Sequence, residues 1–231
     1  MLVFFVNFTL LFPDICYNDR EVNMKKYIGI LFKAILAGIM ISIGGTINLS
    51  LKTNVIGALL FGIGLFMICV NGYNLYTGKI GYLFDNKTSY LLELLMTLIG
   101  NLIGTIACGY LLMLTRIGSK LKEVAQTICT VKLDDTWYSI LILSMFCGML
   151  MYLAVNLYKE IKDGGKYIAV FVCVIVFILC GFEHCVANMY YFSAANMWTW
   201  KTVLYMAIMI LGNSIGSLII SLGHKLIKKL S

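Results

Sequence analysis

The chain has 231 residues, of which 61% are hydrophobic and only 13% are charged, and its mean hydropathy is +0.91. Soluble domains are about half apolar and about a quarter charged, so this composition excludes a soluble globular protein. The net charge of +7 does not indicate a nucleic-acid partner, because the basic residues cluster between apolar runs, where membrane topology needs them.

Six apolar runs are each long enough to cross a lipid bilayer, which takes about 20 residues. They lie at 27–51, 55–76, 91–114, 136–158, 167–192 and 203–222. The sequence therefore predicts an all-α integral membrane protein with six transmembrane helices. An even number of spans puts both termini on one side. Lys and Arg are more numerous on that side, so we expect cytoplasmic termini in a plasma-membrane protein.

We expect residues 27–225 to form one membrane domain and residues 226–231 to form a cytoplasmic tail. Residues 1–26 are expected to be a cytoplasmic or interfacial segment. Within it, the apolar stretch 1–12 is too short to span and is a poor signal peptide. Met24 begins a second plausible start, so residues 1–23 are either interfacial or an over-extended start.

The cysteines show no CxxC or paired Cys/His spacing, and most lie inside apolar runs. We therefore expect no metal, no cofactor and no disulfide framework.

The short motif GNxIG[ST] occurs at 100–105 and again at 212–217. The alternative to a repeat is two independent packing motifs, because GxxxG spacing lets helices approach closely. With three spans in each half, a repeat must be inverted, at about 27–114 and 136–225. Inverted repeats commonly place a transport pathway at their interface. Asn101 and Asn213, at the second position of each motif, are expected to support the backbone.

The second span of each half is interrupted, at 70–78 (VNGYNLYTG) and at 180–188 (CGFEHCVAN). Neither interruption contains proline, so glycine must relieve the backbone. Matching Gly-interrupted segments indicate two broken helices that meet at a midplane site.

His184 is expected to lie near the middle of the fifth span, where ionisable groups are costly and usually mark a pathway. Its alternative role is to bond a carbonyl. Adjacent Glu183 is expected to support the break by capping backbone N–H groups. Thr77 supplies a hydroxyl that can orient the imidazole or bond an ion. Asn188 follows His184 by four residues and shares its helical face.

Candidate pore-lining apolar residues are Phe61, Leu65, Leu75 and Phe177. Spacing alone favours ordinary packing for each of them. Lys132 is usually interpreted as a solvated loop charge, but beside a pore mouth it would concentrate anions.

The segment NLYTG at 74–78 resembles the ELFTG motif of the formate/nitrite transporter family. The segment GFEHCVANMY at 181–190 closely resembles its GFEHSIANM motif. The two GN motifs and LAV at 153–155 agree, and the resemblance covers about residues 28–225. It departs from the family at Asn74 (usually Glu), Gly148 (Asn in some members), Asn156 (Trp in some members) and Tyr76 (Phe).

The resemblance implies an aquaporin-like fold of six helices, two of them broken, assembled as a homopentamer in the lipid bilayer. Each protomer would conduct small monovalent anions such as formate, nitrite, hydrosulfide or lactate. Thr77 and His184 would form the central site, bordered by Asn188. Glu183 would support the break, and Lys132 would attract anions at the outer vestibule. The resemblance assigns the constrictions to Phe61, Leu65, Leu75 and Phe177, with Tyr76 at the cytoplasmic slit.

The function that we expect is an anion channel in which the anion is transiently protonated at the central site. The alternative is a proton-coupled, alternating-access transporter of small carboxylates. A membrane enzyme using Cys185 or Cys180 beside His184 is not expected, because a second base and an oxyanion motif are missing from the sequence.

Overall fold

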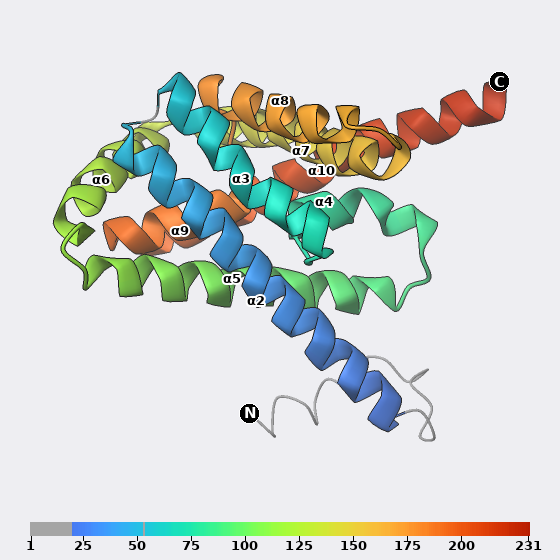
Figure 1. The fold of residues 1–231 in the computed structure, drawn as a ribbon, viewed down its shortest axis with the longest axis horizontal. Helices are drawn as coiled ribbons and strands as arrows, with labels where there is room; N and C mark the ends of the chain where they lie inside the picture. The colour runs from blue at the N-terminus through green and yellow to red at the C-terminus, as the bar shows by residue number, and fades with distance from the viewer. Residues whose placement is uncertain (1–19, 53) are drawn as a thin grey trace.

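The computed structural model describes the backbone of residues 20–52 and 54–231, and the side chains from residue 24 onwards within those ranges. Our expectations for residues 1–19 lie outside the described residues. The regular secondary structure of the described residues is helical (Figure 1). The bounds of the helices are α2 Arg20–Ser50, α3 Val55–Asn71, α4 Tyr76–Lys79, η2 (a 3₁₀ helix) Ile80–Asp85, α5 Tyr90–Met113, α6 Gly118–Asp134, α7 Trp137–Glu160, α8 Gly165–Leu179, α9 Cys185–Ala195 and α10 Trp200–Leu230.

Four described helices are long and apolar enough to cross a membrane unaided: most of α2 and the whole of α5, α7 and α10. Helix α3 and the segment Tyr76–Asp85 pass the same test together, bent by 54° at the break. The expected span at 167–192 is divided between α8, of 15 residues, and α9, of 11 residues. Neither half reaches the roughly 20 residues of a full span, so the described helices give four continuous spans and one bent span.

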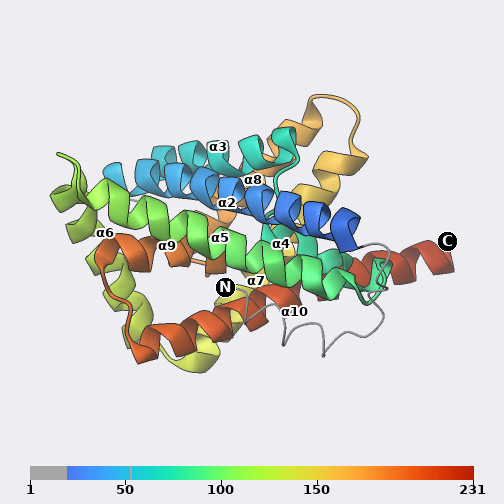
Figure 2. The same cartoon turned by 90° about the horizontal axis from the view of Figure 1, so that it is seen from below.

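Each half of the chain contains one closely packed helix pair: α2 packs on α5 in the first half, and α7 packs on α10 in the second (Figures 1 and 2). Gly38 lies against the backbone of Asn101, and Gly148 lies against the backbone of Asn213. At both contacts an added Cβ would collide with main-chain atoms, so only glycine allows the approach. Gly148 therefore matches Gly38 of the other half.

Helix α6 lies between the expected spans at 91–114 and 136–158, in a segment for which the sequence analysis predicted no helix. Leu121, Ala125 and Cys129 are buried at a spacing of four residues, which gives α6 an apolar stripe. The stripe packs toward α9, and Gln126 Nε2 donates to Ala195 O at 3.3 Å. The four-residue spacing is visible in the sequence and could have identified this helix.

Candidate functional site

Both helix breaks have the same backbone construction. Gly72 ends α3 with φ of 63°, and Gly181 follows α8 with φ of 68°. Nothing lies within 4 Å of a Cβ built on either glycine, so a side chain would have room at both positions. Glycine is needed there because the backbone is left-handed, a conformation that other residues rarely adopt. The chain then continues in extended conformation through Leu75 and His184, which precede α4 and α9.

Asn101 on α5 bonds the first break on both sides. Its Oδ1 accepts from the backbone N–H of Tyr76 at 2.9 Å. Its Nδ2 donates to Asn74 O at 2.9 Å and to Ala34 O at 2.8 Å. One buried amide therefore satisfies the first N–H of α4 and a carbonyl of the break, and it ties both to α2.

Asn213 on α10 makes the corresponding contacts in the second half. Its Oδ1 accepts from Cys185 N at 2.9 Å. Its Nδ2 donates to Glu183 O at 2.7 Å and to Ser144 O at 2.8 Å. The two GN motifs thus place equivalent amides beside equivalent breaks, which an inverted repeat requires.

His184 and Thr77 meet across the two halves. Thr77 Oγ1 lies 2.9 Å from His184 Nε2, although the residues are 107 positions apart in the chain. His184 Nδ1 accepts from the backbone N–H of Ala187 at 3.0 Å and so caps α9. A neutral ring that accepts at Nδ1 carries its proton on Nε2. The ring therefore donates to the Thr77 hydroxyl.

Apolar rings cover the imidazole. Phe177 of α8 stacks on His184 with ring centroids 5.6 Å apart, and Phe61 of α3 meets Phe177 edge-on at the same distance. His184 is only 2% exposed, and Thr77 is fully buried. Leu65 and Leu75 are also buried. The polar pair therefore lies in apolar surroundings, where a charge is costly.

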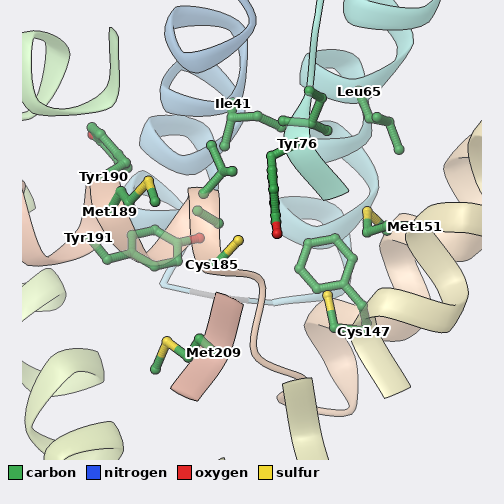
Figure 3. Close-up of a cluster of buried hydrophobic side chains, with 14 of the residues drawn as sticks. Ile41, Leu65, Tyr76, Cys147, Met151, Cys185, Met189, Tyr190, Tyr191 and Met209 are labelled. Atoms are coloured by element: carbon green, nitrogen blue, oxygen red, sulfur yellow. The ribbon is translucent and has the colours of Figure 1, made fainter. Parts of the chain in front are cut away.

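Tyr76 belongs to the same buried cluster as Leu65, Cys147 and Cys185 (Figure 3). Its hydroxyl lies 2.9 Å from Ser214 Oγ on α10. Ser214 donates its proton to its own helix, at Ile210 O, so the tyrosine must be the donor. Tyr76 thus links α4 to α10, a contact that the sequence analysis missed although Ser214 lies inside the second GN motif.

Within the described residues, the Glu183 carboxylate bonds Lys132 and Asn188, and not the backbone N–H groups that we expected it to cap. Lys132 Nζ lies 2.7 Å from Glu183 Oε2. Asn188 Nδ2 donates to the same oxygen at 2.6 Å and approaches Met209 Sδ at 3.2 Å. The Lys132 side chain is 12% exposed, so it is not a solvated loop charge. Helix α6 is what brings Lys132 to Glu183. In the part of the chain that the structure describes, Asn188 bonds Glu183 and not Thr77.

The sequence profile of the formate/nitrite transporters matches residues 17–225. The chain belongs to the formate/nitrite transporter family. It is 29% identical over 209 residues to the uncharacterized transporter YrhG of Bacillus subtilis (strain 168), with 78% of each chain covered. It is 26% identical over 243 residues to the formate-nitrite transporter of Plasmodium falciparum (isolate 3D7), with 88% of this chain and 78% of the relative covered.

Among curated relatives, the nitrite transporter NirC of Escherichia coli (strain K12) is 28% identical over 165 residues, which cover 67% of this chain and 61% of NirC. Among solved structures, a pentameric formate channel with formate bound has a TM-score of 0.76 at 21% identity. That match covers 90% of this chain and 99% of the channel. An FNT family ion channel has the same TM-score, over 88% of this chain and 91% of its own. The chain is therefore an all-helical integral membrane protein with the fold of these channels.

Proposed function

We propose that the protein is a channel for small monovalent anions such as formate, nitrite or hydrosulfide, and that the anion passes the Thr77–His184 pair between apolar constrictions. The observation that carries the proposal is the 2.9 Å contact between Thr77 Oγ1 and His184 Nε2, covered by the ring of Phe177. Membership of the formate/nitrite transporter family and the similarity to a formate-nitrite transporter and to a nitrite transporter support the anion class.

The direction of the hydrogen bonds indicates how an anion is received. The ring donates to Thr77 Oγ1, so the threonine keeps its own proton for another acceptor. An anion arriving at the pair meets this hydroxyl proton, backed by the Nε2–H behind it. Charge-assisted hydrogen bonds of this kind are stronger than neutral ones, and this partly replaces the lost hydration.

Transient protonation lowers the cost of crossing the constrictions. A bare anion pays several kcal/mol or more to enter an apolar passage, whereas the neutral acid does not. The backbone N–H of Ala187 occupies His184 Nδ1, so a ring that gave up its Nε2 proton would become an imidazolate. The proton that neutralises the anion therefore comes from water, while the Nε2–H and the Thr77 hydroxyl hold the anion in place. Net movement is anion plus proton, or the anion alone when the proton returns.

The constrictions and the charged groups complete the pathway. The pathway is narrowed on the two sides of the Thr77–His184 pair by five side chains: Phe61, Leu65, Leu75, Tyr76 and Phe177. Glu183 and Asn188 stabilise the second break. Lys132 attracts anions toward the outer vestibule while its ion pair with Glu183 fixes it in place. Asn101 and Asn213 hold both breaks.

The architecture proposed for the assembled protein has six spans, with α8 and α9 together as the second broken span. Both termini are cytoplasmic in the plasma membrane, and residues 27–225 form one domain. A homopentamer is supported by the similarity to a pentameric formate channel.

Reconstitution in liposomes tests the proposal. Uptake of formate, nitrite, hydrosulfide and lactate is compared across pH for the wild type, His184→Ala and His224→Ala. We expect His184→Ala to lose flux or change its pH response, and His224→Ala, which alters the histidine packed beside Tyr152, to behave as the wild type. An unchanged flux and pH profile in His184→Ala would remove the histidine from the mechanism. Strongly saturating counter-transport would favour the alternating-access alternative.

A further inference from the structure

The end of the bundle that contains the last turn of α7 and helix η2 is here called the inner end. At this end, two side chains of α7 contact the same tyrosine. Tyr82 Oη donates to Asn156 Oδ1 at 3.2 Å. Lys159 Nζ lies 3.8 Å from the centroid of the Tyr82 ring. Asn156 and Lys159 are three residues apart, so they lie on the same face of α7.

The amide nitrogen of Asn156 points to a ligand. Among the described residues, Asn156 Nδ2 is a buried side-chain nitrogen without a hydrogen-bond partner, and the residue is only 7% exposed. The Tyr82 hydroxyl already donates to the amide oxygen of Asn156, so the N–H groups of Nδ2 remain available to a ligand. Leaving a buried donor unpaired costs about 1–3 kcal/mol, and native proteins rarely do so.

The charge of Lys159 remains available to an anion. Its ammonium lies over an aromatic face, which attracts a cation but leaves N–H groups for other acceptors. The neighbouring carboxylates pair elsewhere: Asp85 with Lys225 at 2.7 Å and Glu160 with Lys228 at 3.7 Å. Lys159 lies in the last turn of α7 and is exposed there, at the inner end of the bundle.

The pair lies next to the proposed pathway. Gly78, which follows Thr77, packs so closely on the Val155 side chain that a Cβ would lie 2.7 Å from it. Asn156 is the next residue of α7, and Lys159 lies about 6 Å further toward the inner end than Val155, at 1.5 Å per residue. An anion held there lies beside the contact between α7 and α4, the helix that carries Thr77.

We propose that Asn156 Nδ2 and Lys159 Nζ together bind one small oxyanion, a carboxylate or nitrite, and load it into the channel from the inner end. The ammonium supplies charge and the amide supplies a directed hydrogen bond, which suits an anion with two oxygens. The inference rests on the proposed function, because the ligand is the permeant anion.

Formate entry into the channel from each side of oriented proteoliposomes tests the inference. Asn156→Leu removes the amide at similar volume, and Lys159→Met removes the charge at similar length. We expect the half-saturating formate concentration for entry from the inner side to rise several-fold in both variants, and the value for the outer side to stay unchanged. Asn156→Asp replaces donors by acceptors and is expected to raise the inner value further.

Lys162→Met is the matched control, because it removes an exposed lysine just beyond α7 with the same change in net charge. An equal shift in Lys162→Met would overturn the inference in favour of general surface charge. Unchanged inner half-saturation in Asn156→Leu and Lys159→Met would show that the amide holds water only. Absence of formate flux in the wild type contradicts the proposed function instead, so the two failures are distinguishable.

Discussion

The first and second helix breaks share a backbone but differ in the side chains that they display. Each has a left-handed glycine and an extended residue before the new helix. Each is also bonded by an asparagine of a neighbouring helix, Asn101 or Asn213, here called the asparagine clamp. The extended residue is Leu75 in the first half and His184 in the second. The second helical residue after the break is Thr77 in the first half and Val186 in the second. The two breaks therefore share one backbone scaffold, and the Thr77–His184 pair that we propose as the anion site lies where they differ.

The two breaks also differ in how the following helix is held. His184 caps α9 with its own ring, whereas Leu75 offers α4 no side-chain hydrogen bond. Helix α4 has 4 residues against 11 in α9. The first break therefore depends more heavily on its asparagine, and the predictions below test this asymmetry.

The largest effect is expected from removing a clamp. Asn101→Ala and Asn213→Ala each leave up to three buried backbone groups unpaired, at about 1–3 kcal/mol per group. We expect Asn101→Ala to lower the melting temperature in detergent more than Asn213→Ala, because α9 retains its histidine cap. Asn71→Ala is the control, since Asn71 is exposed and, among the described residues, its amide bonds the carbonyl of Met67 in its own helix. Equal melting of all three variants and the wild type would contradict the clamp.

A smaller loss is expected from breaking the ion pair between α6 and the second break. Lys132→Met leaves the Glu183 carboxylate buried without its cation, which costs about 3–5 kcal/mol. Combining Lys132→Met with Glu183→Gln should recover part of that stability, because the uncompensated charge is then gone. Thermal unfolding of the two single variants and the double variant measures the coupling. Strictly additive losses would mean that the two groups do not interact.

A loss of transport without a large loss of stability is expected from Thr77→Val. The change keeps the shape of the side chain but removes the hydroxyl, and one strong hydrogen bond corresponds to about a 10- to 100-fold change in flux. Formate uptake by liposomes measures it. The matched control is Thr105→Val, whose hydroxyl bonds only carbonyls of its own helix. Wild-type flux in Thr77→Val would exclude the hydroxyl as an anion contact.

The smallest effect is expected from Tyr76→Phe, which restores the aromatic residue of the family motif. The variant loses the bond to Ser214, worth about 1 kcal/mol, while Ser214 keeps its bond to Ile210. We expect slightly lower thermal stability and a formate flux changed by less than about fivefold. A loss as large as that of Thr77→Val would mean that the hydroxyl contacts the anion directly.

Much of the fold was predictable because membrane helices are encoded locally. Apolar runs of about 20 residues identified α2, α5, α7 and α10, and the family membership inferred from the two interrupted motifs is confirmed. The expected fifth span, at 167–192, does not qualify as a continuous span, because α8 and α9 are each too short to cross a membrane alone. Helix α6 was missed because its apolar stripe is narrow and its average hydropathy is close to neutral.

The sequence alone determined that the chain is helical, lies in a membrane, belongs to a transporter family and is interrupted near 70–78 and 180–188. Only the tertiary structure decided which side chains meet: Thr77 with His184, Lys132 with Glu183, and Asn156 with Tyr82. Hydropathy and glycine placement act over a few neighbouring residues, so the sequence displays them directly. Contacts between residues far apart in the chain, such as Thr77 and His184 at a separation of 107 positions, depend on how helix pairs pack. That packing is set by glycine contacts and asparagine clamps between elements distant in the chain.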